Sequence, residues 1–235
     1  LPDELFHRFR DVGTAEILAE FYIKGGRQDL APPLYEKMIE ASPGNKKIRW
    51  NLIYFYFDLK DDQRAFDWLE KLVREFPDDD LALKTLVGLS NPEPRRKKTI
   101  PLLEERVRRR PEEAHWALAL AELYEDDEDW ERAISVYRER YAMEPSSGAW
   151  LVRLARASQR ANRPGDAQKH YEAWLALGEK DPAVLKEIGL ESFFSNHFKT
   201  AETAFLAAEK SAPLDGEIQF FLGEIYWAEG RRDRA

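Results

Sequence analysis

The chain has no cysteine, few histidines and no long hydrophobic run. The absence of cysteine excludes a disulfide framework, a thiol nucleophile, a cysteine-ligated zinc site and an iron–sulfur cluster. The histidines are far apart in the sequence, at His7, His115, His170 and His197. We therefore expect neither a metal site nor a histidine-based catalytic triad. No stretch approaches the roughly 18 to 20 apolar residues of a membrane-spanning helix, so direct membrane insertion of this chain is not expected.

Basic residues are also in deficit, because 36 Lys and Arg face 44 Asp and Glu, for a formal net charge of −8. This balance argues against a general nucleic-acid-binding protein, which must neutralise phosphates. No phosphate-binding loop and no acid/base pair of carboxylates stands out, so we expect no cofactor and no enzymatic activity. The 12% aromatic content is instead typical of an ordered protein.

The strongest pattern that is present is a period of 34 residues. Prolines follow it at Pro43, Pro77, Pro111, Pro145 and, after one skipped unit, Pro213. Alanine fills six of the seven positions of a second column: Ala31, Ala65, Thr99, Ala133, Ala167, Ala201 and Ala235. Aliphatic residues fill a third column: Leu18, Leu52, Leu86, Leu120, Leu154, Ile188 and Leu222. Large residues fill a fourth: Tyr35, Leu69, Leu103, Tyr137, Tyr171 and Phe205. Such self-similarity predicts a repeat architecture.

Within a repeat the apolar spacing is helical, as in Trp116, Leu120, Leu123 and Tyr124, and no segment alternates with a period of two. Turn residues divide each repeat, so we predict two helices joined by a short turn. The alanine column is expected where the two helices cross most closely, and the proline column where the second helix ends. Pro101 is expected in the first turn of its helix, where proline is tolerated.

These columns resemble the tetratricopeptide repeat, whose pattern is W-x2-L-G-x2-Y, then A-x3-F, then P. The resemblance implies an all-α, right-handed α-solenoid, or superhelix, of tandem helix-turn-helix units. We place the repeats at 12–45, 46–79, 80–113, 114–147, 148–181 and 182–215, with a truncated one at 216–235. Residues 1–11 are predicted to form a cap or the remnant of an upstream repeat. The chain is expected to be a fragment of a longer array.

The resemblance also implies that partners bind a concave groove lined by the first helices. The groove positions most suited to binding are Trp50, Tyr54, Phe57, Lys84, Arg156, Arg160, Phe193, Phe220 and Trp227. Clustered aromatic residues near arginine are typical of binding hot spots. Two readings stay open for the aromatic residues, because rings at this spacing also pack between neighbouring helices. For Phe220 and Trp227, a following repeat that covers them is a further alternative.

A basic run gives a second candidate surface for an anionic partner: Arg95, Arg96, Lys97, Lys98, Arg106 and Arg109. The alternative is a solvated face that the acidic segment 112–131 neutralises.

The sequence thus favours a non-catalytic scaffold that binds a partner protein or peptide. The alternative is an envelope module of a bacterial exopolysaccharide-export system, which positions a modifying enzyme or contacts the polysaccharide, by analogy with repeat proteins of such systems. The absence of cysteine is compatible with export, and we favour the bacterial periplasm or envelope over the cytoplasm. Self-association is a third possibility.

Overall fold

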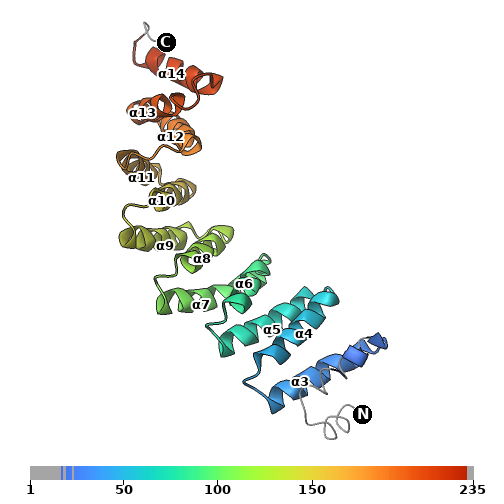
Figure 1. Cartoon of the computed structure of the whole chain (residues 1–235). Coiled ribbons are helices and arrows are strands. Elements are labelled where there is room, and N and C mark those ends of the chain that lie inside the picture. Colours follow the sequence, from blue (N-terminus) through green and yellow to red (C-terminus); the bar gives the residue numbers. More distant parts are fainter. Residues whose placement is uncertain (1–16, 18–19, 23, 232–235) are drawn as a thin grey trace. The chain divides into compact units, whose positions relative to one another are not determined.

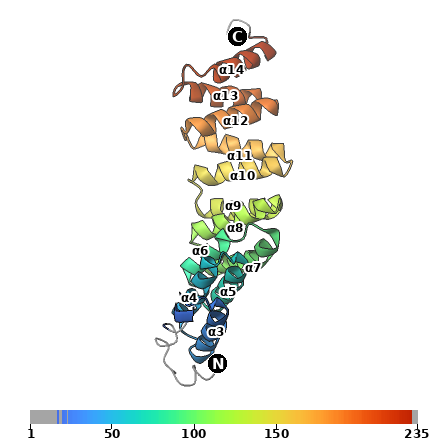
Figure 2. The same ribbon diagram turned by 90° about the vertical axis from the view of Figure 1, so that its right-hand side faces the viewer.

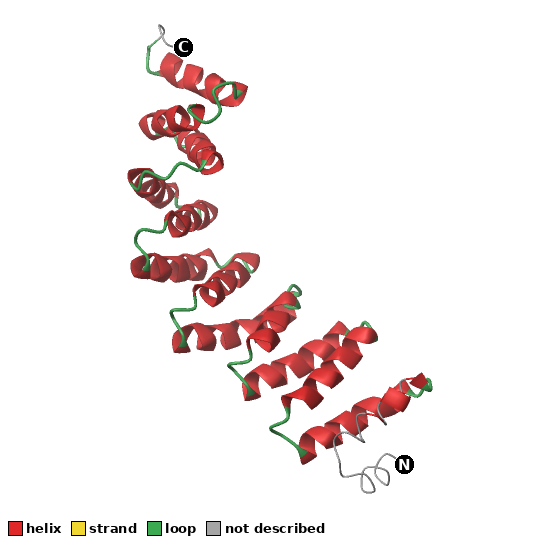
Figure 3. Ribbon diagram, in the orientation of Figure 1, coloured by secondary structure: helices red, strands yellow, loops and turns green. Residues whose placement is uncertain are grey.

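The computed structural model describes residues 17, 20–22 and 24–231. The predicted N-terminal segment 1–11, Leu18 and Ala235 lie outside the described residues. The chain divides into two compact units, Leu1–Arg110 and Pro111–Ala235, and each unit consists of tandem helical hairpins (Figure 1). Helices joined by short loops account for the described residues, and no strand occurs among them (Figure 3). The predicted all-α solenoid class is confirmed.

The first unit contains a short 3-10 turn and five described helices. They are η1 (Gln28–Leu30), α3 (Ala31–Ala41), α4 (Lys46–Asp58), α5 (Asp62–Glu75), α6 (Asp80–Gly88) and α7 (Glu93–Arg109). Helices α4 and α5 form one hairpin, and α6 and α7 form the next. The helices α3, α5 and α7 end at or just before the residue preceding a proline of the predicted column, as expected.

The described part of the second unit contains seven helices. They are α8 (Ala114–Asp126), α9 (Trp130–Met143), α10 (Gly148–Arg160), α11 (Pro164–Ala176), α12 (Pro182–Phe194), α13 (Phe198–Glu209) and α14 (Gly216–Ala228). The pairs α8 and α9, α10 and α11, and α12 and α13 form hairpins. In Figure 2 the helices of this unit lie in successive layers, so the first helix of one hairpin follows the second helix of the hairpin before it.

The predicted columns form the core of both units. In the alanine column, every described member from Ala31 to Ala201 is at most 1% exposed. The described members of the aliphatic and large columns are at most 4% exposed. The expected close crossing is most evident in the hairpin of α12 and α13, where a Cβ on Gly189 would lie 2.5 Å from the ring of Phe205. Small residues therefore bring the paired helices together.

The helix ends repeat with the same period. Asn45, Asp79, Asp181 and Asp215 each precede a first helix and accept a hydrogen bond from a backbone amide in its first turn. Such N-caps satisfy donors that have no partner within the helix. Outside the third repeat, the described turn that follows each first helix uses a left-handed residue, with φ between 56° and 74°: Gly26, Lys60, Glu128, Asn162, Asn196 and Gly230.

The third repeat differs because Pro94 stands where the period requires a left-handed residue. The proline ring fixes φ near −65° and forbids that turn. Helix α6 is accordingly short and α7 begins early, at Glu93. Pro101 therefore lies inside α7 and not in its first turn, which corrects our prediction. In the same hairpin Thr99 replaces alanine, and its hydroxyl lies 2.6 Å from that of Ser90, also fully buried.

We expect Glu128→Gly to raise the free energy of unfolding by about 0.5–1 kcal/mol, because a side chain in the left-handed region is strained and glycine is not. Urea denaturation followed by far-UV circular dichroism measures the change. Glu139→Gly is the matched control, because Glu139 is exposed within the right-handed helix α9, where glycine should be destabilising by about 1 kcal/mol. Equal destabilisation by both changes would contradict the assignment of this turn.

Candidate functional site

A furrow in the second unit runs between the first helices α10 and α12. On α10, the residues Leu151, Leu154 and Ala155 are buried, whereas Arg156 and Arg160 are exposed. This division follows the helical period, which gives α10 an apolar face for the core and a polar face for the furrow. Figure 1 shows both helices within this unit.

Two hollows adjoin along the furrow. One has a volume of about 580 Å³ and is lined by Arg156, Gln159, Arg160, Tyr171, Glu187 and Glu191. The other has a volume of about 360 Å³ and is lined by Ala149, Val152, Arg153, Arg156, Trp174, Glu179, Asp181 and Val184. We call the first the polar hollow. We call the second the apolar hollow after Ala149, Val152, Trp174 and Val184, although Arg153, Arg156, Glu179 and Asp181 also line it. Because Arg156 lines both, it marks the boundary between them.

An ion pair crosses the furrow at this boundary. The Nε atom of Arg156 lies 2.7 Å from one carboxylate oxygen of Glu187, and Nη2 lies 2.5 Å from the other. The hydroxyl of Tyr171 donates to Glu187 at 3.3 Å. The hydrogen bond to Glu187 raises the pKa of Arg156, even though partial burial acts against the charge. A bidentate pair with a third donor holds the boundary in one geometry.

Similar pairs link other successive first helices, with partners 31 residues apart. The Nη1 atom of Arg153 lies 3.7 Å from a carboxylate oxygen of Glu122 of α8. The Nζ atom of Lys186 of α12 lies 2.6 Å from a carboxylate oxygen of Glu217 of α14. In the polar hollow, Gln159 donates to Glu191 at 2.5 Å. Most polar groups that face the furrow are therefore already paired within the chain.

One donor at the furrow has no partner among the described residues. Arg160 is exposed, makes no ion pair or side-chain hydrogen bond with them, and also lines a hollow of about 380 Å³ on the α8 side of α10. An unpaired guanidinium is a group that a bound segment can satisfy.

Comparison with protein families identifies the repeat. Tetratricopeptide repeat models match residues 22–89, 117–148 and 186–235. The chain belongs to the tetratricopeptide repeat proteins. No curated protein sequence matches it. In a tetratricopeptide array the furrow described above lies between the first helices of two consecutive repeats.

Solved structures support the same fold. The structure of Naa15/Naa10 bound to HypK-THB matches with a TM-score of 0.71 at 13% identity, over 95% of this chain and 35% of that one. The chain thus spans about a third of that protein. PilW, a type IV pilus biogenesis factor, matches with a TM-score of 0.52 at 16% identity, over 89% and 97% of the two chains. A MamA RS-1 double mutant matches with a TM-score of 0.52 at 14% identity, over 72% and 97%.

The structure places the predicted groove residues in both units, so each set is described separately. In the first unit Trp50 and Tyr54 of α4 stack with ring centroids 5.4 Å apart. Tyr54 is 51% exposed, whereas Trp50 and Phe57 are half-buried. Lys84 of α6 is exposed. On α4, the exposed ring of Tyr54 therefore stacks on the half-buried ring of Trp50.

Trp50 has a second contact within its own unit. Asp79 accepts hydrogen bonds from Nζ of Lys46 at 2.9 Å and from the amide of Ala82 at 3.1 Å, and the side chain of Trp50 also helps to lower the pKa of Asp79. Burial alone would raise the pKa of Asp79, but these donors hold the pKa below its ordinary value. Trp50 thus helps to join α4 to the start of α6, and it has a packing role whether or not it binds a partner.

The aromatic residues of the last tetratricopeptide repeats fall into two groups. Phe193 is half-buried, and its ring lies 4.9 Å from that of Phe221 and 5.7 Å from that of Phe198. This favours the packing alternative for Phe193. Phe220 and Trp227 of α14 are 60% and 65% exposed. The sequence analysis did not identify Phe221, although its ring contacts those of Phe193, Phe194, Phe205 and Phe220.

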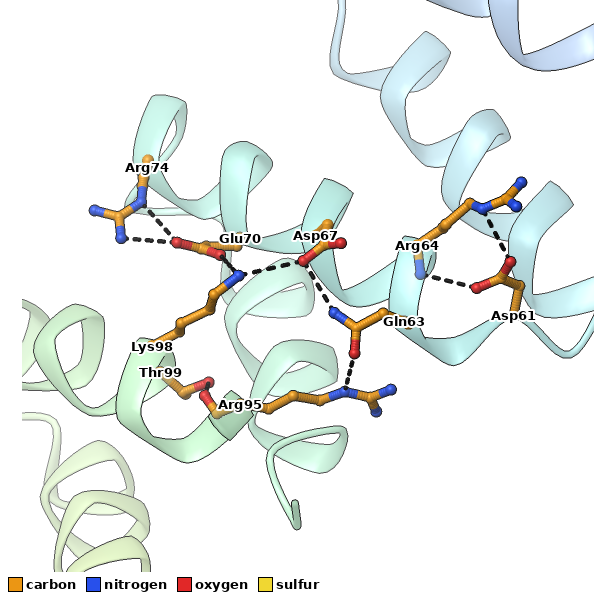
Figure 4. Close-up of polar contacts among 9 residues, drawn as sticks. All are labelled: Asp61, Gln63, Arg64, Asp67, Glu70, Arg74, Arg95, Lys98 and Thr99. Atoms are coloured by element: carbon orange, nitrogen blue, oxygen red, sulfur yellow. Dashed lines mark hydrogen bonds and ion pairs between the residues drawn. The ribbon is translucent and has the colours of Figure 1, made fainter. Parts of the chain in front are cut away.

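The basic run lies on α7, where acidic side chains of α5 neutralise part of it (Figure 4). Lys98 lies 3.2 Å from Glu70 and 3.3 Å from Asp67, and Arg95 donates to Gln63 at 3.2 Å. Further contacts hold the rest of the run: Arg96 bonds the carbonyl of Asn91, Lys97 pairs with Glu93, and Arg109 pairs with Asp78. These pairs favour the solvated-face alternative, with the acids supplied by α5 and the turn after it.

Arg106 has to be removed from the proposed docking patch, because it is only 3% exposed. Its guanidinium donates to the carbonyl of Pro77 at 2.9 Å and to Asp80 at 2.6 Å. Arg49 likewise donates to the carbonyl of Pro43. In the second unit Arg140 donates to the carbonyl of Pro111. We call each pair an arginine–proline latch; it satisfies the carbonyl at the boundary between two repeats.

The described residues contain no group of three or more His, Asp or Glu side chains that could hold a metal ion. Among them there is also no helix of the length and apolar character needed to cross a membrane.

Proposed function

We propose that this chain is a non-catalytic scaffold that binds an extended segment of a partner protein in the furrow between α10 and α12. The observation that carries the proposal is the pair of adjoining hollows, in which apolar side chains lie beside charged ones and Arg160 has no partner among the described residues. Concave sites of this mixed character are typical of ligand binding. Tetratricopeptide repeats are generally interaction scaffolds, which supports a binding role over a catalytic one.

The first unit offers a second surface for the same role, considered by itself. It consists of Trp50, Tyr54 and Phe57 on α4 together with Lys84 on α6. A stacked aromatic pair with an exposed hydroxyl-bearing ring is a suitable anchor for an apolar side chain.

The envelope alternative, in which the chain contacts a polysaccharide or positions an enzyme, rests on the sequence alone. None of the three solved structures described above is of a polysaccharide-export protein. The periplasmic location and self-association likewise remain predictions from the sequence.

A photo-cross-linking amino acid at position 149 tests the furrow. Ala149 is exposed and lines the apolar hollow, so the probe should cross-link a partner protein from an extract of the source organism. The matched control is position 142, because Ala142 is exposed on the second helix α9 and should not yield that product. The proposal is wrong if both positions capture the same proteins, or if neither captures any.

The identified partner then tests the first unit. Trp50→Ala combined with Tyr54→Ala should weaken its binding if the α4 surface contributes, with helicity checked by circular dichroism. Unchanged affinity would confine the site to the second unit.

A further inference from the structure

The two hollows of the furrow differ in chemistry, and the difference follows the helix axis. Toward the start of α10 and α12, Ala149, Val152, Trp174 and Val184 provide apolar walls, beside the charged side chains of Arg153, Glu179 and Asp181. Toward the end of α10, Gln159, Arg160 and Glu191 provide polar ones. Because the order of residues along α10 matches the order along α12, the furrow has a defined direction from its apolar to its polar end.

The pairing within the furrow favours an acidic ligand group at the polar end. The carboxylate of Glu187 is neutralised by Arg156, whereas Arg160 has no partner in the part of the chain that the structure describes. A ligand carboxylate can bond Arg160 without breaking any existing ion pair, and a charge-assisted hydrogen bond of this kind is strong. Glu191 opposes such a ligand, because its partner Gln159 is uncharged.

The distance between the two ends sets the spacing of the ligand groups. Val152 and Arg160 are eight residues apart on α10, which corresponds to about 12 Å at about 1.5 Å per residue. An extended segment rises about 3.3 Å per residue, and its side chains return to the same face at every second residue. Side chains four residues apart therefore lie on one face and span a similar length.

We infer that the furrow selects an extended partner segment that carries an acidic side chain for Arg160 and, four residues away, an apolar side chain for the apolar hollow. The inference rests on the proposed function and adds the chemistry and spacing of the partner. The apolar side chain is expected to pack between Val152 and Val184, with the backbone of the segment passing over the pair of Arg156 and Glu187.

Selection of a displayed library of random dodecapeptides against the full chain tests this inference. The selected peptides should share an Asp or Glu and an apolar residue four positions apart. Arg160→Ala should weaken their binding by about tenfold to a hundredfold, the range for a lost charge-assisted hydrogen bond. Ala149→Glu, which fills the apolar hollow with a charged group, should weaken it by about tenfold or more.

Two matched controls separate local effects from changes in net charge. Arg138→Ala removes an exposed, unpaired arginine on α9, and Ala142→Glu adds a carboxylate to the same helix. Both variants should bind the selected peptides as the unaltered chain does. Glu191→Gln removes the opposing charge and should tighten binding by about two- to fivefold. If the furrow instead selected a basic side chain, Glu191→Gln would weaken binding.

Different results would contradict the proposed function and the inference about the ligand. Peptides that bind at the furrow, as shown by loss of binding in Ala149→Glu, but lack the acidic residue or the spacing would overturn the inference and leave the proposed function intact. Selected peptides insensitive to both Arg160→Ala and Ala149→Glu, or a selection that yields no binding peptide, would overturn both.

Discussion

Replacement of Gly189 by valine is expected to lower the free energy of unfolding by about 3 kcal/mol. A Cβ at this position would lie 2.5 Å to 2.7 Å from three ring atoms of Phe205. Phe205 is fully buried, and its ring stacks on Phe221 at a centroid distance of 5.8 Å. Because the ring is buried and already stacked, we expect α12 and α13 to separate to accommodate the valine. Urea denaturation followed by circular dichroism measures the loss.

The sign of the smaller change Gly189→Ala is the sharper test. Alanine in an exposed helical position is favoured over glycine by about 1 kcal/mol, so Gly165→Ala in α11 should be neutral or stabilising, because a Cβ there meets nothing within 4 Å. Gly189→Ala should instead be destabilising, and Phe205→Leu in the same chain should reduce its effect. A stabilising Gly189→Ala would show that the ring adjusts freely and that the close packing is not required.

The sequence contains both residues of this contact, Gly189 and Phe205, but only as members of two separate columns of the repeat. The residue after the aliphatic column and the residue of the large column, sixteen positions later, have complementary sizes. The pairs are Ile53 with Leu69, Val87 with Leu103, Ala121 with Tyr137, Ala155 with Tyr171, and Gly189 with Phe205. As the first member becomes smaller, the second becomes aromatic. The period predicted the fold because each repeat fills the same volume with different residues.

The helix boundaries were predicted less well where one residue overrides the pattern. The left-handed turn recurs at a fixed place in the repeat, but Pro94 cannot adopt it. Helix α7 therefore begins before the position that the repeat frame assigns to it, and Pro101 becomes an interior residue. A prediction that combined the period with the φ preference of each residue would have found this shift.

The furrow was predicted only in part. The frame placed Arg156 and Arg160 on the exposed face of a first helix, which the structure bears out. Which arginine is paired depends on residues 31 positions away, such as Glu187 for Arg156, and the relative orientation of consecutive repeats decides these contacts. The same holds for Arg106, whose partners belong to the preceding turn. For Arg106, the charge in the sequence predicted an exposed docking patch, whereas the structure shows a buried arginine–proline latch.

The arginine–proline latch of the second unit gives the other large expected effect. Arg140 is 3% exposed, and its guanidinium bonds both the carbonyl of Pro111 and the carboxylate of Glu144. Glu144 also accepts from the indole of Trp150 at 3.1 Å. Arg140→Met keeps the apolar stem but leaves the Pro111 carbonyl without its donor. We expect the free energy of unfolding to fall by about 2–3 kcal/mol, because the change removes the hydrogen bonds that a buried, charged guanidinium makes to this carbonyl and to Glu144.

The Glu144 pair contributes less than a fully buried pair would, because the Glu144 side chain is 45% exposed and water replaces part of the interaction. Arg140→Lys retains one charged donor, so its stability should lie between those of the unaltered chain and of Arg140→Met. Arg138→Met is the control, since Arg138 lies two residues away on the exposed face of α9, and its loss should change stability by less than about 0.5 kcal/mol. If thermal unfolding shows the same midpoint for Arg140→Met as for Arg138→Met, the carbonyl at the repeat boundary does not need the arginine, and the latch has no energetic role.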